Sequence, residues 1–509
     1  MKSMINSIWK SYFAHRKYTY TRDEILSYQD TFLVDLMTAN KDTLVGKKYN
    51  FAEVYDYETF KKNIPVFHYD EYKEYIYMSV QWEQNIICSD DIDFWAKTSG
   101  TTSDYQKYIP VTKRYLENNH YKWWKDTFSN YISSNPDTKL FEWKWITIWW
   151  AISKNDYTNE DNVWNISAII QINNNILINY FFTEPEEKIS FLSDWNHKIS
   201  KIIESCKDTN ITSTIWVASW SLYLLKQLVV SQNLNFVDDI WPDYELFLTG
   251  GMNYIPLSKN IYSLFRKSIN IRQVYNACEW YIWSQFYNND EYMHLLLCHD
   301  IYYEFLLFDD YELWNFNKTI NIFYIKANVD YIIIITNSAW LYRYILWDTI
   351  KFINTEEFIF EITGRNKLHL DSFSERVREN HTDKAIFNLS KKYNLIISDY
   401  HVWVIMNNSN DWSWYHMRII ELDLENINYN NSSVLSDFEK YIDTELIDNN
   451  ITYNQKRSGN ILLQNPVVQL VPKGTFAKRF ASKWKLWWQH KIPKLRNDDT
   501  IIKEIIDLL

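Results

Sequence analysis

Glycine is too rare in this chain for an ordinary protein of its length. Only 7 of the 509 residues are glycine, whereas average usage would give about 36. A chain of this size needs glycine for left-handed turns and helix ends, where other side chains are strained. The same sequence holds 25 tryptophans, and some of them are adjacent, as at Trp123-Trp124, Trp149-Trp150 and Trp487-Trp488.

We therefore expect many of these tryptophans to be glycines that were read with the wrong genetic code. The codon UGA is decoded as glycine in some lineages and as tryptophan in others. The chain is rich in Asn, Ile, Lys and Tyr, whose codons are AT-rich, as in genomes where such reassignment occurs. The alternative is a tryptophan-rich protein whose indoles form a core or a platform for carbohydrate.

Charge and cysteine usage exclude several classes of protein. The net charge of −11 argues against nucleic acid as a partner, which would require a basic surface. No apolar run approaches the roughly 18 residues of a membrane span, and the N-terminus lacks the apolar core of a signal peptide. The four cysteines have no C-x-x-C spacing and the histidines have no ligand spacing, so we predict neither a disulfide framework nor a zinc site. We expect a cytoplasmic protein that does not bind membranes.

Hydrophobic periodicity predicts an α/β protein with large mixed sheets flanked by helices. The pattern after Phe352 becomes one of shorter alternating segments, so we expect a large N-terminal domain over 1–358 and a smaller α+β domain over 359–509. The predicted helices cover 22–40, a short segment before Ile64-Pro65-Val66, 190–206 and 220–232, and the predicted strands cover 146–152, 167–172, 295–298, 331–336 and 358–362.

A segment rich in hydroxyl groups is the strongest local signal for chemistry. Its backbone N–H groups and hydroxyls could surround a polyphosphate, and Lys107 would supply positive charge. The segment lacks the GxxxxGK[ST] order of a P-loop. A Ser/Thr-rich surface turn is the alternative for this segment taken alone. Its residues are Thr98, Ser99, Gly100, Thr101, Thr102 and Ser103.

Two further segments carry carboxylates beside tryptophans that we suspect to be glycines. With glycine restored, 275–283 reads YNACEGYIG and 339–348 reads AGLYRYILGD. The chain then resembles the auxin-responsive acyl acid–amido synthetases, the plant hormone-conjugating enzymes and their bacterial relatives. The motifs of that family are similar: an SSGTT-type loop, Y-x-x-S-E-G and L-Y-R-Y-x-x-G-D, in this order.

The resemblance extends over nearly the whole chain. The flanking segments that match are 43–51, 216–220, 241–251 and 487–495. Trp220 and Trp241 lie where the family itself has tryptophan, so not every tryptophan is expected to be recoded. Cys278 stands for the usual serine, and Trp280, Trp283, Trp340 and Trp347 stand for expected glycines. An indole where the backbone must approach ATP would fill the site, so we expect the chain as written to be a poor enzyme.

The resemblance implies an adenylate-forming fold with a mobile C-terminal domain. It implies that a carboxylic acid reacts with ATP to give an acyl-adenylate and pyrophosphate, and that an amine such as an amino acid then displaces AMP. Formation of an acyl-CoA or other thioester, and a non-catalytic binding protein on this fold, are the alternatives.

Site residues follow from the same resemblance. The hydroxyl loop and Lys107 would hold the phosphates of ATP, and Glu279 would bind Mg²⁺. Lys491 would neutralise charge during adenylation, and Arg343 would support its own segment, the one that resembles L-Y-R-Y-x-x-G-D. Tyr275, Asn276 and Ala277 would line the adenine, and Asp348 would bind the ribose hydroxyls.

Overall fold

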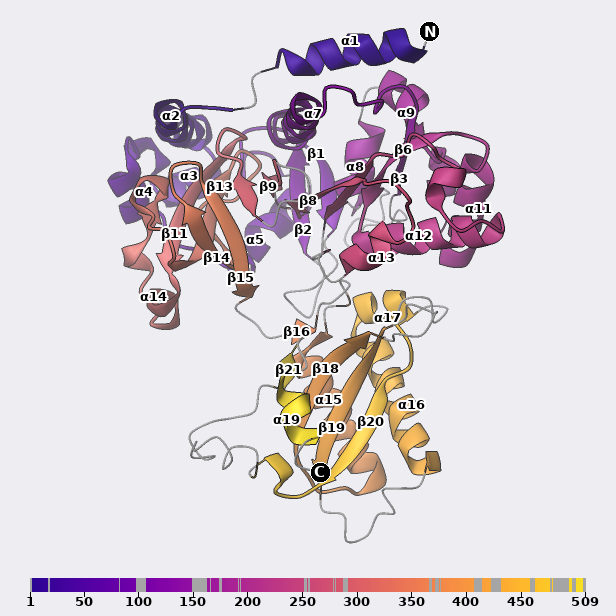
Figure 1. Ribbon diagram of the computed structural model, residues 1–509. Coiled ribbons are helices and arrows are strands. Elements are labelled where there is room, and N and C mark those ends of the chain that lie inside the picture. Colours follow the sequence, from indigo (N-terminus) through magenta and orange to yellow (C-terminus); the bar gives the residue numbers. More distant parts are fainter. Residues whose placement is uncertain are drawn as a thin grey trace. The chain divides into compact units, whose positions relative to one another are not determined.

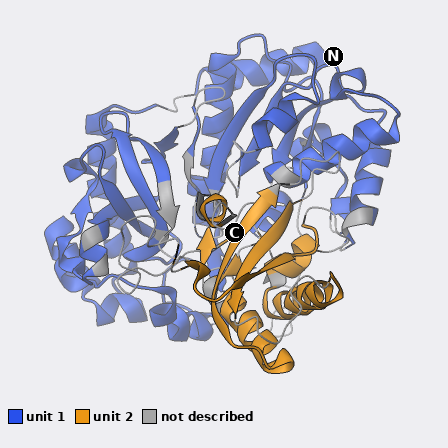
Figure 2. Cartoon of the chain, turned by 60° about the horizontal axis from the view of Figure 1, so that its bottom comes forward, with its two compact units in different colours: residues 1–98, 103–366 blue, residues 99–102, 367–509 orange. Residues whose placement is uncertain are grey.

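A computed structural model divides the chain into two compact units (Figure 2). Unit 1 comprises residues 1–98 and 103–366, and unit 2 comprises 99–102 and 367–509. The structure describes residues 2–16, 19–81, 83–97, 107–148, 163–164, 166–173, 176–190, 192, 194–250, 254, 257–277, 279, 281–286, 292–365, 369–370, 375, 377–406, 414–422, 432–457, 463–476, 478, 494–496 and 500–506.

The main sheet of unit 1 has a parallel half and an antiparallel half. Its order is β12-β11-β13-β14-β15-β10-β9-β8-β7-β6-β3-β5. The neighbouring pairs β5–β3, β3–β6, β6–β7 and β7–β8 are parallel. All pairs from β8–β9 to the β12 edge of the sheet are antiparallel. The bounds are β3 Lys144–Thr147, β5 Thr183–Glu184, β6 Ile211–Trp216, β7 Leu246–Gly250, β8 Asn270–Asn276, β9 Tyr281–Ser284, β10 Met293–Leu295, β11 Ile301–Leu307, β12 Ile320–Asn321, β13 Asp330–Asn337, β14 Tyr344–Asn354 and β15 Ile359–Arg365.

Crossover helices cover the parallel half, as parallel pairing requires (Figure 1). They are α11 (Trp195–Cys206), α12 (Ala218–Ser231) and α13 (Ser258–Tyr262). The predicted helices over 190–206 and 220–232 are therefore confirmed to within a few residues. Two further helices, α1 (Lys2–Ala14) and α7 (Lys122–Ser134), pack against each other through Phe13 and Phe128.

The antiparallel half is built around β13, whose run of isoleucines is buried on both faces. Helices α2 (Arg22–Asn40), α4 (Tyr57–Asn63) and α5 (Tyr69–Val80) contribute to the core cluster that this strand shares. The Thr21 side chain accepts from the Glu24 amide and the Glu24 carboxylate accepts from Thr21, so a capping box starts α2 at the predicted residue. The helix over 22–40 and the strand over 331–336 are confirmed.

Two strand predictions differ from the structure. The strand predicted over 295–298 coincides with β10 only at Leu295, because the strand ends there. The second prediction is wrong throughout. Residues 167–172 lie in the helix α8 (Ile166–Ile172), not in a strand. Ala168 and Ile169 are buried while Ile172 is exposed, so the segment buries one side only. A short apolar run does not distinguish a strand from a buried helical turn, and this explains the error. Of the strand predicted over 146–152, the structure describes β3 alone.

A small sheet of unit 1 contains the strands that precede and follow the hydroxyl segment in the sequence. Strand β1 (Ile92–Lys97) pairs antiparallel with β2 (Tyr108–Thr112) and parallel with β4 (Val163–Trp164). Residues 98–106, between β1 and β2, lie outside the described part of the chain. Lys97, the last residue of β1, pairs with Tyr108, the first residue of β2.

Unit 2 is an α+β fold with a four-stranded sheet, as the sequence predicts. The order is β20-β19-β18-β21, with bounds β18 Ile397–Met406, β19 Trp414–Leu422, β20 Val467–Pro472 and β21 Leu495–Arg496. Its helices are α15 (Glu379–Tyr393), α16 (Ser432–Asn449), α17 (Ile451–Arg457) and α19 (Thr500–Ile506). Trp403, Ile419 and Ile505 form a core on one face of this sheet.

Candidate active site

The structure describes six of the predicted site residues with their side chains. The hydroxyl loop Thr98–Ser103 and Lys491 lie outside the described residues, as do Cys278 and Trp280, and the side chain of Asn276 is not described. Their predicted roles stay predictions. The six described residues are Lys107, Tyr275, Ala277, Glu279, Arg343 and Asp348.

Lys107 directly precedes β2 and is buried, with 4% of its surface exposed. Its Nζ donates to the Tyr344 hydroxyl at 3.0 Å and lies 5.0 Å from the centre of the Tyr69 ring. The Tyr69 hydroxyl accepts from the Tyr108 amide at 2.8 Å, which fixes the start of β2. The ammonium group is therefore held against the first residue of β14.

Glu279 lies in the turn between β8 and β9 and is buried. Its backbone oxygen accepts from the Tyr115 hydroxyl at 2.6 Å and from Asn337 Nδ2 at 3.0 Å. Its carboxylate is close enough to Tyr344 to affect that phenol. Burial first, and the Glu279 charge second, raise the pKa of Tyr344 well above its usual range. Tyr344 therefore contacts the lysine of one motif, and its pKa responds to the charge of the carboxylate of another.

Asn337 closes the turn that follows β13. Its Oδ1 accepts from the backbone N–H groups of Ala339, Trp340 and Leu341 at 3.2, 3.2 and 3.1 Å. Its own N–H donates to the Leu341 oxygen at 2.9 Å. These bonds satisfy buried backbone donors that the turn would otherwise leave unpaired.

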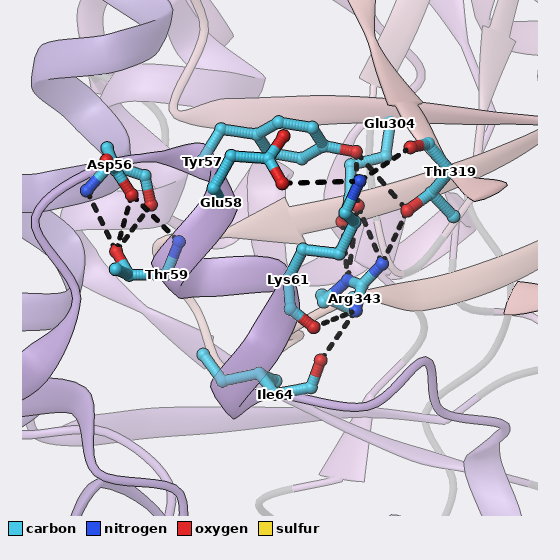
Figure 3. A network of polar contacts seen from close by, with 9 residues as sticks. All are labelled: Asp56, Tyr57, Glu58, Thr59, Lys61, Ile64, Glu304, Thr319 and Arg343. Carbon is cyan, nitrogen blue, oxygen red and sulfur yellow. Dashed lines mark hydrogen bonds and ion pairs between the residues drawn. The ribbon is translucent and has the colours of Figure 1, made fainter. Parts of the chain in front are cut away.

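Arg343 is enclosed by groups of the protein itself (Figure 3). Its guanidinium donates to both carboxylate oxygens of Glu304 at 2.9 Å, to Thr319 Oγ1 at 2.7 Å and to the Ile64 oxygen at 2.6 Å. Ile64 directly follows the C-terminal end of α4, where the helix dipole favours a positive charge. All three guanidinium nitrogens are thus engaged, and we interpret Arg343 as a residue that supports its segment.

Tyrosine and threonine complete this network. The Tyr57 hydroxyl lies 3.2 Å from Glu304 Oε1 and 3.2 Å from Thr319 Oγ1, on the far side of the ion pair from Ile64 (Figure 3). Burial, and then the charge of Glu304, raise the pKa of Tyr57 above its usual range. A capping box of Asp56 and Thr59 starts α4, so the helix that presents Tyr57 and Ile64 is itself fixed.

Asp348 is buried at an irregularity of β14. Ile332 pairs with Thr349, and Ile334 pairs with Ile345. A step of two residues along β13 therefore corresponds to a step of four residues along β14, so β14 bulges there. Such bulges re-aim side chains and occur beside active sites. Tyr275 lies near the end of β8, opposite Trp283 of β9. Glu279 follows in the turn that joins these two strands.

The donor set fits magnesium bound to a polyphosphate. Mg²⁺ prefers oxygen ligands and is commonly held by one or two carboxylates plus phosphate oxygens. Among the described residues there is no cluster of three or more His, Cys, Asp or Glu that would hold an ion alone. The single buried carboxylate of Glu279 therefore suits a metal that arrives with its nucleotide. No helix in the described ranges has the length and apolar character needed to cross a membrane.

Three residues that support the candidate site were not predicted from the sequence. Asn337, Tyr115 and Glu304 are each buried and each bond to a residue of a predicted motif. A signal for Asn337 was present, because it is a polar residue at the end of β13, after the isoleucine run and Thr336. We find no local pattern that would have singled out Tyr115 or Glu304.

Trp340 is fully buried and has a negative φ, so its backbone does not require glycine. The indole packs edge-on against Tyr72 at 5.1 Å and against Tyr69 at 6.3 Å. Its Nε1 is buried without a hydrogen-bond partner. Such a donor costs about 1–3 kcal/mol. The described part of the site thus contains one tryptophan that is packed but not satisfied.

Comparison with known proteins gives consistent results. Residues 15–143 match the GH3 family N-terminal domain, 294–365 the GH3 family central domain and 380–500 the GH3 family C-terminal domain. A 95-residue segment is 32% identical to the 4-substituted benzoates-glutamate ligase GH3.12 of Arabidopsis thaliana. That segment is 18% of this chain and 16% of that relative.

Solved structures share the fold. The GH3.15 acyl acid amido synthetase superposes with a TM-score of 0.57 at 18% identity, over 94% of this chain and 93% of that one. The AtGH3.15 acyl acid amido synthetase in complex with 2,4-DB gives the same score and identity, over 100% and 96%. At this identity the likeness concerns the fold.

Proposed function

Because this chain belongs to the GH3 family, we propose that it joins a carboxylic acid to an amine at the expense of ATP. The acid oxygen attacks the α-phosphorus of ATP, the bond to the β-phosphate oxygen breaks, and pyrophosphate leaves. The amine nitrogen then attacks the acyl carbon of the adenylate, loses a proton and releases AMP. An amino acid is the amine that we propose, as in the glutamate ligase named above.

One observation supports this proposal most strongly. Lys107 donates to the Tyr344 hydroxyl and the charge of Glu279 affects the same phenol, although the three residues come from three motifs far apart in the sequence. Adenylation requires positive charge and metal at the phosphates more than a nucleophilic side chain. A lysine and a carboxylate that both act on one buried tyrosine suit this requirement.

Each residue keeps a role that follows from its position. Lys107 would donate to phosphate oxygens, and Glu279 would hold Mg²⁺ together with them. When bound, Mg²⁺ would neutralise the charge that develops on pyrophosphate. Asp348, re-aimed by its bulge, would accept from the ribose hydroxyls, and Tyr275 and Ala277 would line the adenine.

We also propose that some of the tryptophans are glycines in the natural protein. Helix α14 (Phe308–Glu312) ends with Trp314 N–H bonded to Tyr311 O and Asn315 N–H bonded to Asp310 O, both at 2.9 Å. This is a Schellman motif, and Trp314 occupies its left-handed position with a φ of 56°. Glycine is the residue that usually takes that place.

The indole nitrogens also separate tryptophans that suit the fold from tryptophans that we propose to be glycines. Trp145 Nε1 donates to Leu140 O at 2.7 Å and Trp241 Nε1 donates to Cys206 O at 3.1 Å. In contrast, the buried indole nitrogens of Trp95, Trp340 and Trp403 have no partner. Buried donors are rarely left unpaired in native proteins. Peptide mass spectrometry of the natively produced protein decides the residue at each position, since glycine and tryptophan differ greatly in mass.

We infer a bacterial, cytoplasmic enzyme. Cys88, Cys206 and Cys298 are buried and form no disulfide within the described part of the chain. This agrees with a reducing compartment, where ATP is also available.

Acid-dependent exchange of pyrophosphate into ATP tests the adenylation step. We expect exchange with at least one member of a panel of carboxylic acids that includes 4-substituted benzoates. Addition of amino acids, or of coenzyme A, then distinguishes amide from thioester formation by the mass of the product. A folded protein that binds ATP but exchanges pyrophosphate with no acid would contradict the proposal.

A further inference from the structure

We propose that Asn337 is a positioning residue that couples the Glu279 turn to the turn after β13, and that this coupling sets how strongly Mg²⁺ increases the affinity for ATP. The inference rests on the proposed function, in which Glu279 holds the metal.

The amide of Asn337 joins two separate turns. Its Nδ2 donates at 3.0 Å to the Glu279 oxygen, which also accepts from the Tyr115 hydroxyl at 2.6 Å. Its Oδ1 receives the three N–H groups of 339–341. The side chain is 1% exposed, so water does not compete for these bonds. One amide therefore fixes the β8–β9 turn and the β13–β14 turn relative to each other.

The Glu279 turn depends on this anchor. The Glu279 carbonyl receives two donors from distant elements, one from Asn337 and one from Tyr115. These bonds hold the residue whose carboxylate is proposed to bind the metal. If the backbone moves, the carboxylate moves with it, and a displacement of about 1 Å at such a group is sufficient to reduce catalysis by about 10²-fold.

The second turn carries the other half of the site. Residues 339–341 lead directly to Arg343 and Tyr344, and Tyr344 accepts from Lys107 at 3.0 Å. The Arg343 N–H donates to Thr336 Oγ1 at 2.8 Å, one residue before Asn337. Loss of the Asn337 bonds would therefore loosen Glu279 and Lys107 with respect to one another.

The substitution Asn337→Asp separates positioning from packing. It keeps the size of the side chain and an oxygen that can accept from 339–341, but it replaces the donor to Glu279 by an oxygen that repels the carbonyl. Tyr115→Phe removes the second donor to the same carbonyl. Asn40→Asp is the matched control, because Asn40 is also buried in unit 1 and makes two side-chain bonds of 2.8 Å to backbone, at Leu36 O and Ser89 N.

The test measures ATP binding to the full chain by titration calorimetry, with and without Mg²⁺, alongside pyrophosphate exchange. We expect Asn337→Asp to reduce the gain in ATP affinity due to Mg²⁺ about tenfold, Tyr115→Phe to reduce it in the same direction, and Asn40→Asp to leave it unchanged. Glu279→Gln should abolish the gain.

Two outcomes separate the inference from its premise. Suppose that Glu279→Gln abolishes the gain in ATP affinity due to Mg²⁺ but Asn337→Asp keeps that gain. Any loss of exchange rate in Asn337→Asp is then no greater in meaning than the loss in the control Asn40→Asp. In that case Asn337 has a merely structural role and the inference is wrong. If Glu279→Gln itself keeps the full gain, Glu279 does not hold the metal, and both the assignment and the inference based on it are wrong.

Discussion

The guanidinium of Arg343 and the carboxylate of Glu304 form a buried two-point ion pair, with Nε–Oε2 and Nη2–Oε1 distances of 2.9 Å. Arg343 has a φ of 51°, in the region that favours glycine. Such a conformation is stable when the surroundings over-determine it. Here the ion pair and the bonds to Thr319 and Ile64 do so, and they fix the segment that continues into Tyr344.

We predict that Glu304→Ala destabilises the protein by about 3–5 kcal/mol, because it leaves a buried guanidinium without its counter-charge. Thermal and urea unfolding measure the effect. Glu356→Ala is the control, since Glu356 pairs with Arg22 at 3.2 Å on the surface. Exposed pairs contribute about 0–1 kcal/mol. Equal effects of the two substitutions would contradict the interpretation of Arg343 as a structural support.

We predict that Lys107→Met lowers the rate of pyrophosphate exchange about 10²-fold or more, because a preorganised charge at the phosphates is lost. Methionine retains the length and apolar contacts of the buried stem, so the protein should remain folded. Lys113→Met, six residues further along and exposed, is the control and should keep the wild-type rate. An unchanged rate for Lys107→Met would remove Lys107 from the site.

The fold was predictable where local pattern and burial coincide. The isoleucine run of β13 and the Thr21–Glu24 capping box each depend on neighbours in the sequence, and both elements were predicted. Residues 166–172 were not, because Ile-Ser-Ala-Ile-Ile is equally apolar as a strand or as two helical turns. The structure decides the case by burying one side of α8.

The site was predictable only as far as its motifs are contiguous. Lys107, Glu279 and Asp348 were proposed in this way, and their roles stay predictions. The residues that position them were missed because the bonds span the chain: Tyr115 reaches Glu279 across 164 residues, Asn337 across 58, and Arg343 reaches Glu304 across 39. No local periodicity encodes such a contact, which exists only after the sheet has formed.

We predict that His120 makes the protein sensitive to acid. Its ring lies between Tyr115 and Tyr281, 5.2 Å from each, and burial lowers the pKa of His120 to about 3. Below pH 6.5 the unfolded chain binds a proton that the folded chain does not, so the free energy of unfolding falls as pH falls from about 6.5 to 3. At pH 4.5 the loss is about 2–3 kcal/mol.

The substitution His120→Phe tests this, because it keeps a ring of similar shape and removes the proton. The stability of the variant relative to the wild type, followed by urea unfolding from pH 7.5 to 4.5, should rise as pH falls. The exposed His15 serves as the control, and His15→Phe should run parallel to the wild type. A His120→Phe curve that also runs parallel would show that His120 is protonated without cost in the folded state.

Finally, we predict opposite effects for two tryptophan-to-glycine substitutions. Trp314 is 70% exposed and left-handed at the end of α14, so Trp314→Gly relieves backbone strain of about 1–2 kcal/mol and loses little buried surface. Trp241 is 1% exposed and donates to Cys206 O, so Trp241→Gly should destabilise by about 3–5 kcal/mol. Unfolding in urea distinguishes the two, and the comparison applies to the chain as written. A loss of stability for Trp314→Gly comparable to that for Trp241→Gly would mean that the protein has adapted to tryptophan at 314, which would argue that this residue is read correctly.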